Sequence, residues 1–210
     1  SQSRGLGDVY KRQSLQRLTN SDSGVSAHYT VDESGDVYHH VEEDKRAWHA
    51  GVGAWHDIDD LNSHSVGIEM VNPGHEFGYC GFPFEQVKQV EKLCIQIMGR
   101  YNIEPENVLG HSDIAPDRKQ DPGELFPWQV MAENGVGVWP SISDESFVKA
   151  ASMDLSQALY DYGYRSTIFQ NNVIAFQRHF VPEVFCQKFS GGALSLTKAR
   201  LYALLAGHLL

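Results

Sequence analysis

The segment that most constrains the fold is a polar loop at residues 110–123, with the sequence GHSDIAPDRKQDPG. It places Lys119 eight residues and Asp121 ten residues after His111. Proline and glycine interrupt helices, so these side chains do not share one helical face, and the loop must fold back for its ends to meet. An imidazole nitrogen and a carboxylate oxygen are ligands that a catalytic zinc uses. The loop therefore predicts two ligands of a metal site, with a fixed positive charge beside them.

The same residues also have a simpler interpretation. A histidine and an aspartate ten residues apart are common in polar surface loops, and Lys119 would then be a solvated loop charge. Another candidate, Glu69, lies inside the short apolar run 66–71. A charge in the middle of a core strand costs several kcal/mol unless it is paired or close to a metal. Glu69 is therefore either a functional residue or one partner of a structural ion pair.

The whole string at 110–123 resembles the second metal-binding segment of the zinc-dependent N-acetylmuramoyl-L-alanine amidases, the amidase-2 family related to the peptidoglycan recognition proteins. Further segments resemble this family in the family's own order, and they are residues 25–29, 35–38, 46–51, 61–72, 126–128 and 135–140. The last two are similar to the end of the catalytic domain in the periplasmic, outer-membrane-associated branch. The resemblance makes residues 14–140 the expected catalytic domain.

This resemblance implies an α/β fold, with a mixed central sheet flanked by helices and followed by a small three-helix domain. It implies an enzyme that hydrolyses the amide bond between N-acetylmuramic acid and L-alanine by means of a zinc-activated water. His111 and Asp121 correspond to ligands of Zn2+. Glu69 corresponds to the residue that takes a proton from the water and delivers it to the leaving amine. Lys119 corresponds to the residue that stabilises the developing oxyanion.

Three residues of the early segments are expected at the substrate groove, namely Trp48, His49 and His28. Trp48 would stack on the substrate, and packing in the core is an equal alternative for it. His28 and His49 would line or brace the groove rather than bind the metal. The Ser-Ala-His-Tyr context of His28 matches a position of the family that is not a ligand.

The chain departs from the family near its beginning. Family members have a first zinc ligand, a histidine at the end of an opening strand, which should precede Ser14. Residues 1–13 contain no histidine and match nothing in the family, so we interpret them as an artefactual leader or as a natural flexible terminus. Catalytic zinc normally has three protein ligands, and the chain as written offers two. We therefore expect weak zinc binding and low or absent activity of this chain.

Before residue 140 the sequence predicts a hairpin, a long helix and a strand that leads to the loop. Residues 25–31 and 36–41 are expected to form the two strands of the hairpin. Residues 84–101 carry apolar side chains at steps of three and four, which predicts an amphipathic helix lying on the sheet. Residues 107–110 are expected to form a strand whose end carries His111.

After residue 140 the composition changes. Residues 141–146 are rich in serine and acidic residues and are expected to form a linker. Three helices should follow, around 155–162, around 173–180 and from about 197 to 209. Residues 174–180 resemble the three-helix peptidoglycan-binding domain that often follows these amidases, which makes 141–210 a second domain. The alternative is a helical cap packed on the catalytic domain.

Composition limits the partners. A formal net charge of −10 argues against nucleic acid, because phosphate binding depends on concentrated lysine and arginine. No apolar stretch approaches the roughly 18 residues that a membrane-spanning helix needs, and no signal peptide is recognisable. We expect a monomer in the cell envelope, periplasmic or outer-membrane-associated, or secreted, that acts on peptidoglycan or its muropeptides. The alternative is a peptidoglycan-binding protein without catalysis, although such a binder has no need of the whole catalytic set.

Overall fold

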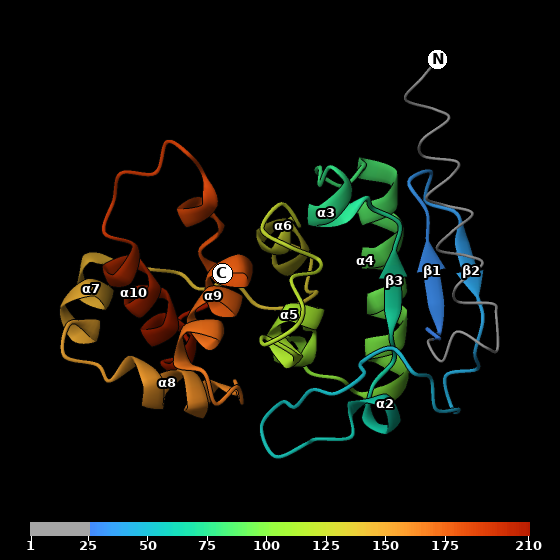
Figure 1. Ribbon diagram of the computed structural model, residues 1–210, viewed down its shortest axis with the longest axis horizontal. Coiled ribbons are helices and arrows are strands. Elements are labelled where there is room, and N and C mark those ends of the chain that lie inside the picture. The colour runs from blue at the N-terminus through green and yellow to red at the C-terminus, as the bar shows by residue number, and fades with distance from the viewer. Residues whose placement is uncertain (1–25) are drawn as a thin grey trace.

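A small mixed sheet with the strand order β2-β1-β3 forms the centre of the fold (Figure 1). The computed structural model describes residues 26–210. The strands are β1 (Tyr29–Val31), β2 (Val37–His39) and β3 (Ile68–Met70). β1 pairs antiparallel with β2 and parallel with β3, so the predicted hairpin and the predicted mixed sheet are confirmed. The predicted leader and first strand lie outside the described residues.

The long helix α4 (Phe84–Tyr101) lies along the sheet and has the bounds that its apolar spacing predicts (Figure 1). Its buried stripe consists of Val87, Val90, Leu93, Cys94 and Ile97. Gln86, at the start of this stripe, is fully buried, and its side-chain amide donates to the carbonyls of Val31 at 3.0 Å and Val71 at 2.9 Å. These bonds satisfy backbone groups at the ends of β1 and β3 and fix the helix on the sheet.

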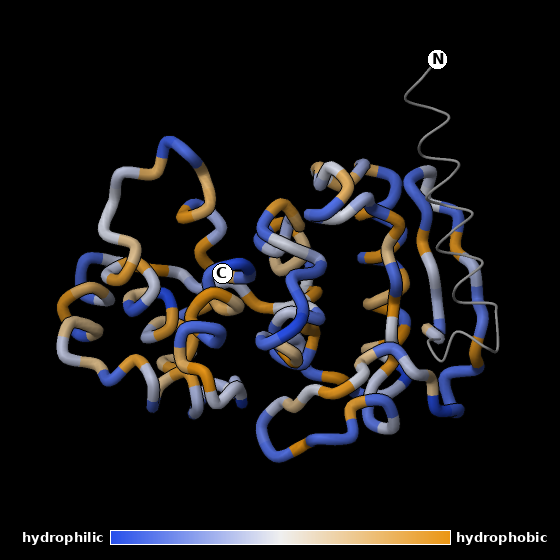
Figure 2. Tube along the Cα trace, in the orientation of Figure 1, coloured by the Kyte–Doolittle hydropathy of each residue, from blue (hydrophilic) through white to orange (hydrophobic). Residues whose placement is uncertain are grey.

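Short helices and loops complete the part of the chain before residue 141. They are α2 (Leu61–His64), α3 (Gly74–Phe77), the 3-10 helix η2 (Pro105–Asn107), α5 (His111–Ile114) and α6 (Trp128–Glu133). The strand expected at 107–110 is not formed, and His111 begins a short helix instead. Within the described residues β3 is an edge strand, residues 107–110 do not pair with it, and the 3-10 helix η2 reaches Asn107. The loop after α5 is hydrophilic along much of its length (Figure 2).

Residues 141–210 form a C-terminal helical unit. Its helices are α7 (Asp144–Ala150), α8 (Leu155–Tyr162), α9 (Phe169–Phe180), the 3-10 helix η3 (Pro182–Phe185) and α10 (Ala193–Leu205). The three predicted helices are present, and α7 is a fourth where a linker was expected. The serines that suggested a linker act at the beginning of α7, where the Ser143 N–H donates to the Ser146 hydroxyl at 3.1 Å.

The C-terminal helical unit shares one hydrophobic core with the rest of the described chain. Trp55 packs edge-to-face on Tyr164, with ring centroids 5.1 Å apart, and both side chains are buried. Gly163 has a φ of +139°, and a Cβ at this position would lie 2.7 Å from the Trp55 ring. Only glycine therefore fits there. Figure 1 shows α5 between the sheet and α9.

None of the helices that the structure describes is both long and apolar enough to span a lipid bilayer.

Candidate active site

The two predicted metal ligands come together because the loop folds back, as its composition predicts. His111 Nδ1 lies 2.9 Å from Asp121 Oδ2. The Ser112 N–H donates to the Asp121 carbonyl at 2.8 Å and closes the loop. The Asp121 side chain is 57% exposed, so the pair faces solvent on one side. An imidazole and a carboxylate thus meet at an accessible position.

The second ring nitrogen of His111 also faces an oxygen. Nε2 lies 3.1 Å from the carbonyl of Ala50. A neutral imidazole has a single N–H, which either ring nitrogen can carry. A histidine that ligates a metal usually donates its other ring N–H to a backbone carbonyl or a carboxylate. The donor set therefore fits a metal between Nδ1 and the Asp121 carboxylate.

Lys119 is close enough to lower the pKa of the Asp121 carboxyl. Burial acts to raise the pKa of the Asp121 carboxyl, but the hydrogen bond from His111 and the charges of His111 and Lys119 lower it below its ordinary value. The carboxylate form is the one that binds metal, so the surroundings of Asp121 favour a ligand. Lys119 itself is half-buried in the loop rather than fully solvated.

Residues 26–210 contain no group of three or more histidine, cysteine, aspartate or glutamate side chains placed to hold a metal ion. His111 and Asp121 account for two ligands, and catalytic zinc normally has three. The segment expected to precede Ser14, which carries the family's first ligand, lies outside the described residues. The described part of the chain thus supplies two ligand positions.

Arg118 contributes to the site although the sequence analysis did not single it out. Its Nε donates to the Val52 carbonyl at 2.7 Å, and its Nη2 donates to the Ala50 carbonyl and lies 3.4 Å from His111 Nε2. The guanidinium thereby ties the loop to the segment 50–52. Its position inside the loop motif was the only signal in the sequence, because its acceptors are more than 60 residues away.

His49 lies beside His111 and borders the beginning of β3. Its Nε2 is 2.8 Å from the Ser65 hydroxyl. Burial, followed by electrostatic interactions with the neighbouring His28 and His111, lowers the pKa of His49 to about 4, so this ring is neutral at pH 7. Gly67 makes the close approach possible, because a Cβ there would lie 2.3 Å from the His49 ring.

His28 braces this region from below the surface. Its side chain is 0% exposed. Nε2 is 3.0 Å from the Lys45 carbonyl, and Nδ1 accepts the Gly67 N–H at 3.0 Å. Both nitrogens are therefore occupied by backbone groups. Of the two roles expected for His28, the structure retains bracing and not direct contact with a substrate.

Trp48 is exposed, which contradicts the alternative of core packing. The side chain is 53% exposed, and the Arg46 guanidinium lies 4.3 Å from the ring centroid. Both residues line a hollow of about 500 Å³ next to the segment 50–52. Val52, which is 87% exposed, lies at the same hollow. An aromatic ring, an apolar side chain and a cation thus face solvent close to the loop 110–123.

Glu69 occupies the middle of β3, opposite Thr30 of β1. Contrary to the expectation of a charge inside a core strand, Glu69 is exposed, while its neighbours Ile68 and Met70 are partly buried. The reason is the alternation of a strand, which turns every second side chain away from the core. Because Gly67 packs beneath His49, β3 begins beside the candidate site.

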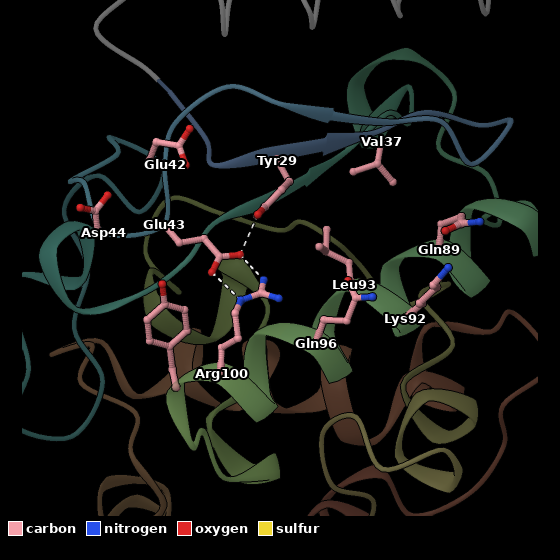
Figure 3. A pocket seen from close by; sticks show the side chains of 11 residues that line it. Tyr29, Val37, Glu42, Glu43, Asp44, Gln89, Lys92, Leu93, Gln96 and Arg100 are labelled. Atoms are coloured by element: carbon pink, nitrogen blue, oxygen red, sulfur yellow. Dashed lines mark hydrogen bonds and ion pairs between the residues drawn. The ribbon is translucent and has the colours of Figure 1, made fainter.

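A larger hollow of about 650 Å³ lies between the hairpin side of the sheet and α4 (Figure 3). Its central charges pair with one another, since Glu43 accepts hydrogen bonds from Tyr29 at 2.7 Å and from Arg100 at 3.0 Å. The bond from Arg100 lowers the pKa of Glu43 to about 2, and burial raises the pKa of Tyr29 to about 12. None of the predicted site residues lines this hollow.

Comparison with known proteins connects this geometry to a family. The Amidase_2 family, described as N-acetylmuramoyl-L-alanine amidase, matches residues 3–124, a range that includes residues 3–13, for which the sequence analysis found no resemblance to the family. N-acetylmuramoyl-L-alanine amidase AmiD of Escherichia coli is 39% identical over 218 residues, which covers 91% of this chain and 77% of AmiD. The 1,6-anhydro-N-acetylmuramyl-L-alanine amidase AmpD of E. coli is 38% identical over 104 residues, with 50% of this chain and 55% of AmpD covered.

Two solved structures share the fold over nearly the whole chain. E. coli AmiD in complex with the substrate anhydro-N-acetylmuramic acid-L-Ala-D-gamma-Glu-L-Lys has a TM-score of 0.79 and 33% identity, covering 94% of this chain and 84% of AmiD. AmpDH3 of Pseudomonas aeruginosa has a TM-score of 0.80 and 32% identity, covering 94% of this chain and 87% of AmpDH3. The two structural matches agree with the α/β fold. The chain belongs to the Amidase_2 family of N-acetylmuramoyl-L-alanine amidases.

Proposed function

We propose that this chain hydrolyses the amide bond between N-acetylmuramic acid and L-alanine in peptidoglycan fragments. The contact between His111 and Asp121, at an exposed position in a chain of this family, carries the proposal. His111 and Asp121 would hold a zinc ion, and zinc would supply a water with a pKa near 7 and polarise the amide carbonyl. The backbone carbonyl of Ala50 can accept an N–H at Nε2 of His111, which leaves Nδ1, beside the Asp121 carboxylate, for the metal and supports this assignment.

The remaining chemistry belongs to side chains of the chain. Glu69 would accept the proton of the attacking water and return it to the departing amine of L-alanine. Lys119 would place its ammonium near the oxygen that becomes negative in the tetrahedral intermediate. His49, which is neutral at pH 7, borders the site without adding a second positive charge. Arg118 holds the loop against the segment 50–52, so the reacting groups keep their spacing.

Removal of Asp121 tests the metal assignment and the function together. Asp121→Ala is expected to weaken zinc binding by more than about 100-fold, because even partners that only orient a ligand cost about 10- to 100-fold. Release of stem peptide from muropeptides should be lost with the metal. The measurements are zinc content by equilibrium dialysis and product release by chromatography, at added zinc. Asp57→Ala is the matched control, since the Asp57 side chain is 99% exposed.

The same assays are applied to a chimera in which residues 1–13 are replaced by the opening segment of E. coli AmiD. We expect weak zinc binding in the chain as written and tighter binding in the chimera. Zinc content that is unchanged by Asp121→Ala in both proteins would refute the ligand assignment. Muropeptide binding without any product, at saturating zinc and in both proteins, would refute hydrolysis and leave a peptidoglycan-binding protein.

Trp48 is expected to contribute to substrate binding. Trp48→Ala should raise KM between about twofold and tenfold and leave kcat nearly unchanged, because an aromatic contact is worth about 0.5–1.5 kcal/mol. Trp48→Phe should restore most of the affinity. Steady-state kinetics on an anhydromuramyl tripeptide measures the effect. Phe84→Ala removes an aromatic side chain that is 73% exposed outside this hollow and should change neither constant. A fall in kcat at constant KM would contradict the role.

We also propose the setting in which the chain acts. The chain would be a zinc-dependent monomer that is periplasmic, outer-membrane-associated or secreted, and its similarity over 91% of its length to an N-acetylmuramoyl-L-alanine amidase supports action on the cell wall. The resemblance of residues 174–180 to a peptidoglycan-binding module supports a role of the C-terminal helical unit in holding the wall. Pull-down with insoluble murein, compared with cellulose, tests this role.

A further inference from the structure

We propose that the C-terminal helical unit is an integral part of the candidate active site, because it holds the metal loop, residues 110–124, in the shape that brings His111 and Asp121 together. This inference rests on the assignment of these two residues under the proposed function. It gives residues 141–210 a second task beyond attachment to the wall. The contacts that carry it begin at Asp113, two residues after His111.

Asp113 joins the metal loop to the C-terminal helical unit. Its Oδ2 accepts the Gly110 N–H at 2.7 Å and the Nδ1–H of His179 at 2.8 Å, and its Oδ1 accepts the Tyr164 hydroxyl at 2.7 Å. Gly110 is the residue just before the α5 helix that begins at His111. The carboxylate of Asp113 therefore fixes the beginning of this helix with one bond and binds the helical unit with two.

All three side chains of this contact are excluded from solvent. The exposed fractions are 0% for Asp113, 1% for Tyr164 and 2% for His179. A buried carboxylate is tolerated only when hydrogen bonds and charges replace the lost water, and here the replacements come mainly from the helical unit. Loss of those donors would favour rotation of Asp113 towards water, and the beginning of α5 would move with it.

The imidazole of His179 is held firmly between two aromatic rings. It stacks on Trp128, with centroids 3.8 Å apart and planes at 21°, and on Phe180, with centroids 3.8 Å apart and planes at 5°. Trp128 belongs to α6, which follows the metal loop. The His179 ring, which donates to Asp113, is thus packed against one ring from α6 and one ring from the C-terminal helical unit. Packing of this kind locks the rotamer of a supporting residue.

Three further residues of the metal loop repeat the same pattern, with four contacts in all. Asp117 accepts hydrogen bonds from Asn171, at 2.8 Å, and from Ser166. Gln120 accepts from Arg178 at 3.2 Å. Glu124 forms an ion pair with Arg178 at 3.4 Å. In each contact the loop supplies the acceptor and the helical unit supplies the donor.

These contacts cover the loop on both sides of the turn between its two ligands. Asp113 follows His111, whereas Gln120 precedes Asp121 directly. A supporting shell of this kind sets the distance between ligand atoms, and an error of about 1 Å is enough to spoil a site. His179 and Tyr164 are therefore positioning residues, which act on His111 and Asp121 through Asp113.

Backbone amide exchange in the full chain tests the proposal without zinc or substrate. The reporter is the amide of Ser112, whose bond to the Asp121 carbonyl closes the loop. His179→Phe keeps a stacking ring and removes the donor, and we expect at least tenfold faster exchange at Ser112. His179→Asn keeps an N–H donor and should restore slow exchange. Tyr164→Phe, a milder change that keeps the ring on Trp55, should give a smaller acceleration.

Thr197→Val is the matched control for general loosening of the helical unit. Thr197 is fully buried in α10 and bonds to Gln177 at 2.9 Å, within the helical unit. The Thr197→Val substitution should accelerate amide exchange in α10 and leave amide exchange at Ser112 unchanged. Two results would overturn the proposal. One is equal acceleration of Ser112 exchange in Thr197→Val, His179→Phe and Tyr164→Phe. The other is no acceleration in His179→Phe and Tyr164→Phe. Amide exchange is measured without catalysis. A protein that shows the expected exchange pattern but does not hydrolyse muropeptides would therefore contradict the proposed function and leave this proposal intact.

Discussion

In the chimera that carries the opening segment of E. coli AmiD, replacing Glu69 by glutamine is expected to lower kcat for muropeptide hydrolysis by about 10²- to 10⁴-fold, the usual contribution of a positioned general base. Glutamine has the shape of glutamate but cannot accept a proton at neutral pH. Because Glu69 is exposed on β3, the change should alter the free energy of unfolding by no more than about 0.5 kcal/mol. Zinc content should stay unchanged, because Glu69 is not one of the proposed ligands.

The measurement combines kcat at saturating zinc, zinc content and urea denaturation for the same preparation. Glu85→Gln is the matched control, since Glu85 is exposed on α4 and lies away from the loop that carries His111. The control should keep kcat, zinc content and stability. A Glu69→Gln protein that retains kcat within about threefold would exclude Glu69 as the general base and move the search to other residues.

Asp113→Ala should cause the largest loss of stability, about 3–5 kcal/mol in the free energy of unfolding. The substitution leaves the His179 N–H, the Tyr164 hydroxyl and the Gly110 N–H buried without their acceptor. For a chain of this length the expected decrease in Tm is about 6–20 °C. The loss arises between the metal loop and the C-terminal helical unit, so both parts should unfold together.

Urea denaturation followed by circular dichroism and by tryptophan fluorescence measures this effect. Asp154→Ala is the control, because Asp154 is also a carboxylate that accepts two backbone N–H groups, but at the exposed beginning of α8. Loss of such a helix cap costs only about 1 kcal/mol. Equal destabilisation by the two substitutions would show that the Asp113 contact contributes no more than a surface cap.

The elements with strong local patterns were predictable. The three- and four-residue apolar spacing of 84–101 predicted α4 with its observed bounds. The alternation and turn residues of 25–41 predicted the β1–β2 hairpin, although the paired strands are shorter. Proline and glycine in the loop predicted that His111 and Asp121 could meet. In each case the information lies within a few neighbouring residues.

Other features depend on partners that are distant in the sequence. The strand expected before His111 is absent because residues 107–110 do not pair with the edge strand β3 of the described sheet. The linker expected at 141–146 contributes to α7, which is stabilised by packing on α10 near the other end of the chain. The importance of Arg118 appears only when its guanidinium meets the carbonyls of Ala50 and Val52.

By itself, the sequence determined the family, the α/β fold and the pair His111 and Asp121, because local periodicity and a dense motif carry that information. Tertiary structure alone decided that His28 is a brace, that Trp48 faces solvent and that Asp113 binds His179 across 66 residues. A buried hydrogen bond or an exposed ring depends on which surfaces meet after folding. A sequence pattern within one segment does not show which distant segments will be in contact. The contacts between the C-terminal helical unit and the metal loop are therefore visible only in the folded chain.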